Sequence, residues 1–139
     1  MTTDALLSRL DKVRKTGAGR WVCRCPAHDD RGPSLAVREL DDGRVLLHCF
    51  AGCEAASVLD AVGLTFSDLF PEPLTQDSMK RERRPFIAGD VLRCLAFESL
   101  IIYQCAISLS KGEQLPQSTR ERLLVAVSRF QHGMEVANA

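Results

Sequence analysis

The sequence predicts an α+β protein in which a small β-sheet with flanking helices is followed by a C-terminal α-helical hairpin. Three observations support this fold class. Two runs rich in leucine and valine flank an Asp-Gly step, which is typical of a β-hairpin. Four cysteine and histidine residues around these runs form two closely spaced pairs. The C-terminal part contains two candidate helices, of which one is apolar on nearly every side and the other begins at a capping box.

The composition is that of a globular protein, because 45% of the 139 residues are hydrophobic and 26% are charged. This length fits one ordinary domain or two very small ones, and a domain of about 60 residues buries too little surface to be stable without additional help. The 18 basic residues balance 18 acidic residues, which argues against a strong, sequence-independent grip on polyanions. Any contact with nucleic acid is therefore expected to be local.

The first predicted element is a short amphipathic helix, whose pattern ends at Gly17 and Gly19. The segment 20–24 follows as a brief strand, which enters a tight turn at Cys25-Pro26-Ala27-His28. The helix is predicted from four apolar residues at helical spacing, which are Leu6, Leu7, Leu10 and Val13.

A β-hairpin and a helix complete this front unit. Segments 34–40 and 44–49 form the hairpin strands, and Asp41-Asp42-Gly43 forms the turn between them. Segment 54–62 is predicted to be a helix, and Gly63 follows it where a left-handed cap is needed. One face of this helix is apolar, and it carries Ala55, Val58, Leu59 and Val62.

The chain is predicted to divide into a front unit at 1–70 and a helical hairpin at 87–139. A linker at 71–86 joins them, because prolines bracket a polar stretch there that has little to bury. In the hairpin, segment 90–109 is apolar on nearly every side. Ser118 and Glu121 predict a capping box for a second helix that runs to about residue 134.

The first helix of this hairpin has more apolar surface than one partner helix covers. A homodimer through the C-terminal helices is therefore expected. The alternative is that this helix packs on the front unit of its own chain.

The sequence predicts a cytoplasmic protein without a membrane segment. The start Met1-Thr2-Thr3-Asp4 lacks the features of a signal peptide, and the most apolar stretch carries Arg93 and Glu98. Six cysteines in such a compartment are expected to be metal ligands or buried thiols rather than disulfides.

The spacing of cysteine and histidine is typical of a structural zinc site. Cys25-x-x-His28 and Cys49-x-x-x-Cys53 each lie in a turn, and the β-hairpin between them folds one turn onto the other. Zinc takes four such ligands in a closed tetrahedral site with no position for water. One structural zinc ion per chain is therefore expected, and catalysis at the metal is not.

Other cysteine and histidine residues compete for this role. Cys23 shares a strand face with Cys25, whereas His48 is expected to point away from Cys49. Cys94 and Cys105 are interpreted as core thiols of the long helix. A set of four buried residues without any metal is the remaining alternative.

Two segments of the chain form a recognisable motif. They are Cys25-Pro26-Ala27-His28-Asp29-Asp30-Arg31-Gly32-Pro33-Ser34-Leu35 and His48-Cys49-Phe50-Ala51-Gly52-Cys53, the latter followed by a helix. Together they resemble the CHC2-type zinc-binding domain of bacterial and bacteriophage DNA primases. The resemblance covers about residues 20–70. It implies that the zinc ligands are Cys25, His28, Cys49 and Cys53. Three residues between the last two cysteines make the motif similar to the phage and plasmid branch.

The resemblance implies that the front unit is a zinc ribbon. In the primases, the sheet of this ribbon helps to recognise the single-stranded template, and the ribbon cooperates with a separate polymerase domain of the toprim type. Here the ribbon is followed by a linker and about fifty helical residues, without room for such a domain. Priming by this polypeptide alone is therefore not expected. An enzymatic function ranks third among the hypotheses, behind the two binding functions given below, because the sequence contains no recognisable nucleophile–base arrangement or phosphate loop.

The front unit also carries aromatic and basic side chains that are typical of single-strand binding. The alternative is that the aromatic residues are core and that the arginines solvate the strands. Asp29 and Asp30 are predicted either to orient His28 or to cap the next turn. The nucleic-acid candidates are Arg20, Trp21, Arg24, Arg31, Arg38, Arg44 and Phe50.

Two functional hypotheses follow. The first is a stand-alone primase-like zinc module, from a phage or mobile element, that binds single-stranded DNA or a replication complex. The second is an adaptor or inhibitor that acts on a host protein. The motif favours the first hypothesis, whereas the balanced charge favours the second.

Overall fold

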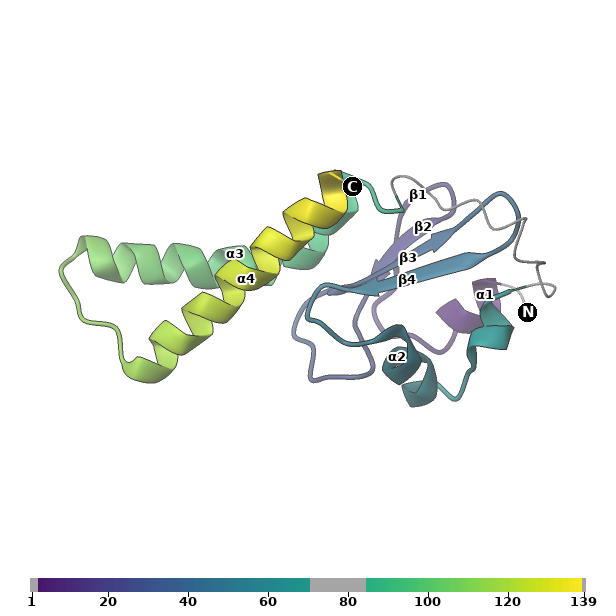
Figure 1. Ribbon diagram of the computed structural model, residues 1–139, viewed down its shortest axis with the longest axis horizontal. Coiled ribbons are helices and arrows are strands. Elements are labelled where there is room, and N and C mark those ends of the chain that lie inside the picture. Colours follow the sequence, from purple (N-terminus) through teal and green to yellow (C-terminus); the bar gives the residue numbers. More distant parts are fainter. Residues whose placement is uncertain (1–2, 71–84, 139) are drawn as a thin grey trace.

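A four-stranded antiparallel sheet and four α-helices form the α+β fold that the sequence predicts (Figure 1). The computed structural model describes residues 3–70 and 85–138. The elements are α1 (Thr3–Leu7), β1 (Arg14–Gly17), β2 (Arg20–Cys23), β3 (Leu35–Glu39), β4 (Val45–Cys49), α2 (Ala55–Ala61), the 3-10 helix η1 (Phe66–Leu69), α3 (Ala88–Ser110) and α4 (Gln117–Asn138).

The β3–β4 hairpin confirms the strongest local prediction. The strands pair from Leu35 with Cys49 to Glu39 with Val45. Their turn is closed by Leu40, whose N–H donates to the Arg44 carbonyl at 2.8 Å. Gly43 has φ 81°, a left-handed conformation that glycine adopts without steric cost.

The N-terminal prediction is wrong in its extent. Helix α1 has only five residues and ends at Leu7, and Lys12 has a left-handed φ of 50° that is incompatible with a continuing helix. Strand β1 follows and pairs with β2, so that the sheet order is β1-β2-β3-β4. Leu10 is nevertheless buried in the core, as an apolar residue outside the helix.

The two faces of the sheet pack on different helices. Register places Cys23, Leu35 and Cys49 side by side on one face, and this face packs on α1 and α2. The other face packs on the start of α3 and the end of α4 (Figure 1). The side chains of that second core are Val22, Ala36, Phe50, Phe86, Val91, Cys94 and Leu95.

The helical hairpin is also confirmed, although its second helix begins differently from the prediction. Ser118 lies inside the first turn of α4, and the Pro116 carbonyl accepts the first helical bond, from Arg120 N–H at 3.0 Å. Ser118 is therefore not the N-cap. A capping box forms instead at η1, where Thr65 and Asp68 exchange hydrogen bonds.

The hairpin packs on the front unit of its own chain. Most of the predicted linker, 71–84, lies outside the described residues. Phe86, which the prediction placed at the end of the linker, is 7% exposed and packs against His48 and Phe50. Within residues 3–70 and 85–138, the front unit covers only the start of α3, since α3 and α4 extend beyond the sheet (Figure 1).

By length and composition, α3 is apolar enough to cross a membrane, and 28% of its most apolar window is buried. Core helices of soluble proteins have the same composition. Two of its buried side chains are acidic and make bonds to other elements: Thr16 Oγ1 donates to Asp90 Oδ2 at 2.9 Å, and Glu98 pairs with α4. This packing fits a helix that is partly buried within a folded protein.

Glu98 joins α3 to α4 through two ion pairs. Arg122 Nη1 donates to Oε2 at 2.8 Å and Arg129 Nη1 donates to Oε1 at 2.7 Å. Burial acts to raise the pKa of Glu98, but the hydrogen bonds and charges of both arginines outweigh burial and lower it. The ion pairs therefore stabilise the fold above the unfolded-state pKa of about 4.3, and this contribution is lost as pH falls through the lower folded-state pKa.

Glu98→Gln is expected to cost about 1–2 kcal/mol at pH 7, since both arginines are partly solvated. The difference from the unsubstituted protein should shrink in acid, where the carboxyl is protonated. Urea unfolding at neutral and acid pH measures both values. An unchanged difference at the two values of pH would contradict the assignment.

Candidate metal centre

Four side chains from two turns converge on one point. The ligand atoms of Cys25, His28, Cys49 and Cys53 all lie within 4.8 Å of one another. The two cysteines Cys25 and Cys49 are buried, whereas His28 and Cys53 are partly buried. The four residues that the spacing singled out are therefore able to hold one metal ion.

The distances within the cluster match a tetrahedral site. His28 Nδ1 lies 3.2 Å from Cys53 Sγ and 3.9 Å from Cys49 Sγ. Metal–sulfur bonds of about 2.3 Å and metal–nitrogen bonds of about 2.0 Å place such atoms roughly 3.5 Å apart in a tetrahedron. A small rearrangement would therefore bring these ligands onto one ion, and the Cys₃His donor set suits a soft or borderline cation.

The fold positions each ligand through a different local feature. Cys25 follows the end of β2, and Cys49 is the last residue of β4. Cys53 lies just before α2, and the turn that leads to it contains Gly52 with φ 97°. A side chain at this left-handed position would be strained, so glycine is needed for the turn.

Asp30 ties the first turn together. Its Oδ2 accepts from Cys25 N–H at 2.8 Å and from Ser34 Oγ at 2.6 Å, and its Oδ1 accepts from Gly32 N–H at 3.3 Å. The Nε2 atom of His28 lies 3.7 Å from Asp30 Oδ1, so the carboxylate faces the ring nitrogen that points away from the cluster. Asp30 therefore caps the turn and is placed to orient His28, whereas Asp29 is exposed.

The thiols of the cluster resist full ionisation without a cation. The Cys25 thiol donates to Cys49, and this bond lowers the pKa of Cys49 to about 5. The same bond, together with burial, raises the pKa of Cys25, and burial and the charge of Cys49 raise the pKa of Cys53. Three thiolates would therefore require a positive ion, and metal binding should release protons and weaken in acid.

The competing residues lie outside the cluster. Burial raises the pKa of Cys23 to about 12, so that it stays a neutral core thiol. His48 projects from the opposite face of β4 and packs on Phe50 and His132. Cys94 and Cys105 on α3 are both buried, and all six cysteines of the chain are free thiols.

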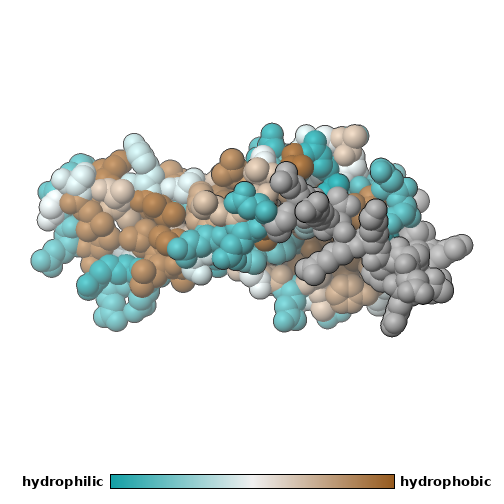
Figure 2. Space-filling view, turned by 45° about the horizontal axis from the view of Figure 1, so that its top comes forward, coloured by the Kyte–Doolittle hydropathy of each residue, from teal (hydrophilic) through white to brown (hydrophobic). Residues whose placement is uncertain are grey.

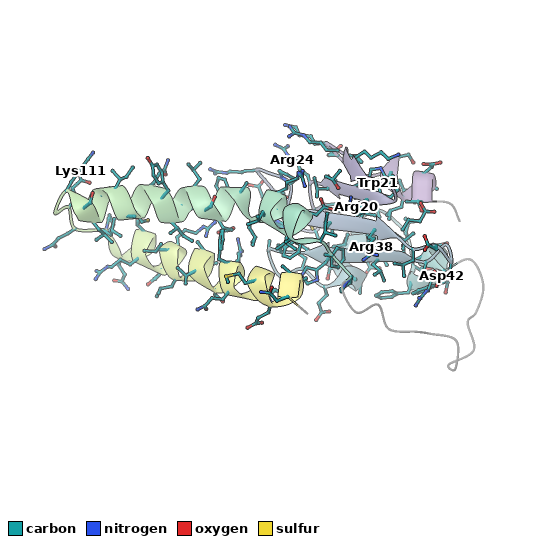
Figure 3. The ribbon with its side chains drawn as sticks, turned by 90° about the horizontal axis from the view of Figure 1, so that it is seen from above. Arg20, Trp21, Arg24, Arg38, Asp42 and Lys111 are labelled. Atoms are coloured by element: carbon teal, nitrogen blue, oxygen red, sulfur yellow. The ribbon has the colours of Figure 1, made fainter. Side chains whose placement is uncertain are left out.

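The predicted nucleic-acid residues do not form one surface. Trp21 faces the α1 and α2 side, whereas Arg20 and Arg38 are paired neighbours on the opposite face of the sheet (Figure 3). Arg38 Nη1 donates to the Pro85 carbonyl at 2.8 Å. Arg24 is half-buried, with Nη2 donating to the Arg31 carbonyl at 3.4 Å, and the Arg31 side chain is exposed.

Two of these candidates are covered by the fold. Phe50 is 2% exposed, because it lies in the core between the sheet and α3, and it offers no ring face for stacking. Arg44 is 9% exposed and its Nε donates to Asp42 Oδ2 at 2.7 Å. Neither Phe50 nor Arg44 is available to contact a nucleic-acid strand in this conformation.

A cavity of about 470 Å³ adjoins the candidate metal centre. One wall is the turn 28–34, and the other is formed by α3 and α4. The α4 residues Arg122 and Arg129 line it, although sequence reasoning did not select them. The one available signal was Glu98, an acid on a largely apolar helix.

Comparison of the chain with protein-family models, with curated proteins and with solved structures finds no match.

Proposed function

We propose that this chain is a zinc-binding, primase-like module that binds single-stranded DNA or a replication complex. The observation that carries this proposal is the convergence of Cys25, His28, Cys49 and Cys53 within 4.8 Å, in a motif that resembles the CHC2-type domain. Zinc is the proposed metal because thiolate and imidazole ligands in a four-fold set suit it best.

The role proposed for zinc is structural. All four positions of a tetrahedral ion would be filled by protein side chains, which leaves no place for a reacting water. A cytoplasmic location belongs to the same proposal, because cysteines remain reduced there and available as ligands.

Single-strand binding is tested by titration with a labelled oligonucleotide at two salt concentrations. Salt-sensitive binding is the expected result, because contacts to phosphates release counterions. The slope should be shallow, since the chain carries 18 basic and 18 acidic residues. Absence of binding at low salt would remove this function and leave the adaptor hypothesis, in which the chain acts on a host protein.

A homodimer is the proposed assembly, and the helical hairpin supplies its surface. Figure 2 shows hydrophobic residues gathered over this hairpin. At 100° per residue, Leu92 and Tyr103 lie on one side of α3, and Val127 and Met134 lie on the adjoining side of α4. Their exposed fractions are 60%, 62%, 36% and 59%. Two antiparallel helices with such a face form half of a four-helix bundle, which a second copy would complete by two-fold symmetry.

Replacing Leu92 and Tyr103 by glutamate is expected to convert the dimer to a monomer, because the charges would be buried between the copies. Light scattering coupled to size exclusion measures the mass. The matched control is Phe66→Glu, since Phe66 is 50% exposed but lies on η1 in the front unit, outside the hairpin. A monomeric parent protein would rule out this assembly.

A further inference from the structure

The cavity beside the candidate metal centre combines an aromatic ring with cationic groups. Phe97 is 36% exposed, and the Arg122 guanidinium carbon lies 5.9 Å from the centre of its ring. Arg129 lines the same wall, and Arg31 lines the facing turn. Aromatic stacking surfaces next to cations are the usual elements of single-strand binding sites.

Glu98 holds both α4 arginines in fixed positions. The Glu98 side chain is 8% exposed, and its carboxylate accepts one bond from each guanidinium, at 2.8 and 2.7 Å. A guanidinium has five N–H donors, and within the described residues these bonds use one donor of each arginine. The side chains of Arg122 and Arg129 are 33% and 31% exposed, so their other donors are accessible from the cavity.

We propose that this cavity binds the backbone of single-stranded DNA, with Arg122 and Arg129 on successive phosphates and Phe97 stacked on a base. This inference rests on the proposed function and moves its main contact from the sheet to the groove between the metal-binding turn and the hairpin. The hairpin thereby contributes directly to the binding site.

The charges around the cavity set the expected strength. The lining contains Arg31, Arg122 and Arg129 as cations, and Asp29, Asp30 and Glu98 as acids. The oxygens of Asp30 and Glu98 are already hydrogen-bonded within the protein. Arg122 and Arg129 therefore keep other N–H donors for a phosphate. The three cations and three acids leave the net charge of the cavity lining near zero. Binding should therefore involve about two or three phosphates, with a slope of roughly −0.7 per phosphate in log affinity against log salt.

The covered sheet supports this location. The second core places α3 over the strand face that carries Val22 and Ala36, and Phe50 lies within that core. The groove beside the turn offers an exposed aromatic ring next to partly exposed guanidinium groups, whereas Phe50 on the covered sheet face is buried.

The test compares Arg122→Gln and Arg129→Gln with Arg120→Gln, by titration with a labelled oligothymidylate of about ten nucleotides at about 50 and 200 mM salt. Arg120 is exposed on the same helix and outside the cavity lining, so its substitution removes the same charge elsewhere. The first two variants should lose about tenfold in affinity at low salt and have a shallower salt slope, whereas Arg120→Gln should bind within about twofold of the parent.

A second measurement uses the unsubstituted protein, since Arg122 and Arg129 also brace Glu98. An oligonucleotide that carries 5-iodouracil should photocrosslink to Phe97, as located by mass spectrometry. Crosslinks confined to Trp21, or full binding by both glutamine variants, would overturn the inference while leaving single-strand binding intact. Absence of binding by the parent protein would instead remove the proposed function. Equal competition by thymidine monophosphate or inorganic phosphate would also overturn the inference about the cavity, because the cavity would then bind a free phosphate and not a DNA strand.

Discussion

Removal of the metal, by chelation or by Cys49→Ser, is expected to unfold the front unit. Structural zinc contributes about 10 kcal/mol or more, which is comparable to the whole stability of a small domain. Cys25 and Cys49 are part of the hydrophobic core that also contains Leu35 and Leu59, so the ligands and the core are lost together. Circular dichroism should show loss of the sheet, and Trp21 fluorescence should shift toward the solvated value.

Elemental analysis should find one zinc per chain in the parent protein and none in Cys49→Ser. Cys105→Ser is the matched control, because Cys105 is a buried thiol on α3 outside the ligand cluster. This variant should keep its zinc. A folded Cys49→Ser protein would show that the metal is not needed for the fold.

Gly133→Leu is expected to separate the two helices of the hairpin and to cost about 3 kcal/mol. Gly133 is buried on α4, and a Cβ atom there would overlap Leu95 Cδ1 and lie 3.2 Å from Val91 Cγ1. Leu95 cannot move aside easily, because it is 1% exposed within the second core. The close packing of α3 on α4 therefore depends on the absence of a side chain at Gly133.

Urea unfolding followed by far-ultraviolet circular dichroism measures this cost. Gly89→Leu, in the first turn of α3, is the matched control, since a Cβ atom at this helical glycine would lie 3.2 Å from Arg93 Nη1, the end of an exposed and flexible side chain. A Gly133→Leu protein as stable as its parent would mean that the two helices are not packed as described.

Elements with strong local signals could be predicted from the sequence. The β3–β4 hairpin follows from an Asp-Gly turn between apolar runs, and the candidate ligands follow from two short spacings. The two long helices are predicted from an apolar segment and from a capping box, although Ser118 is not the N-cap of α4. These signals depend on residues that are close in the chain, so tertiary packing did not alter them.

Strand β1 could not be predicted in this way. Its sequence, Arg-Lys-Thr-Gly, has no apolar alternation, and it becomes a strand only because it pairs along the edge of β2. The Glu98 ion pairs have the same character, because Arg122 and Arg129 lie 24 and 31 residues away in the chain. Contacts of this kind are set by the docking of elements, which leaves little trace in local sequence.

The burial of Phe50 has a similar cause. It lies between two candidate ligands in the sequence, which suggested an exposed aromatic residue beside a metal site. In the structure, Phe50 instead packs against Phe86, and the centres of the two rings lie 6.4 Å apart. A covering helix whose position is unknown from the sequence therefore decides whether an aromatic side chain is available to a ligand.

Strand β4 alternates between two tasks, since Cys49 faces the metal cluster while His48 faces the hairpin. A slip of β4 by a single residue would exchange these faces: it would place an imidazole in the core and a thiol beneath the helices. Cys49 would then be turned away from Cys25, His28 and Cys53, and His48 would lose its contacts with Phe86 and His132. The register of β4 is therefore fixed from both faces of the sheet, by the ligand cluster on one face and by the hairpin on the other.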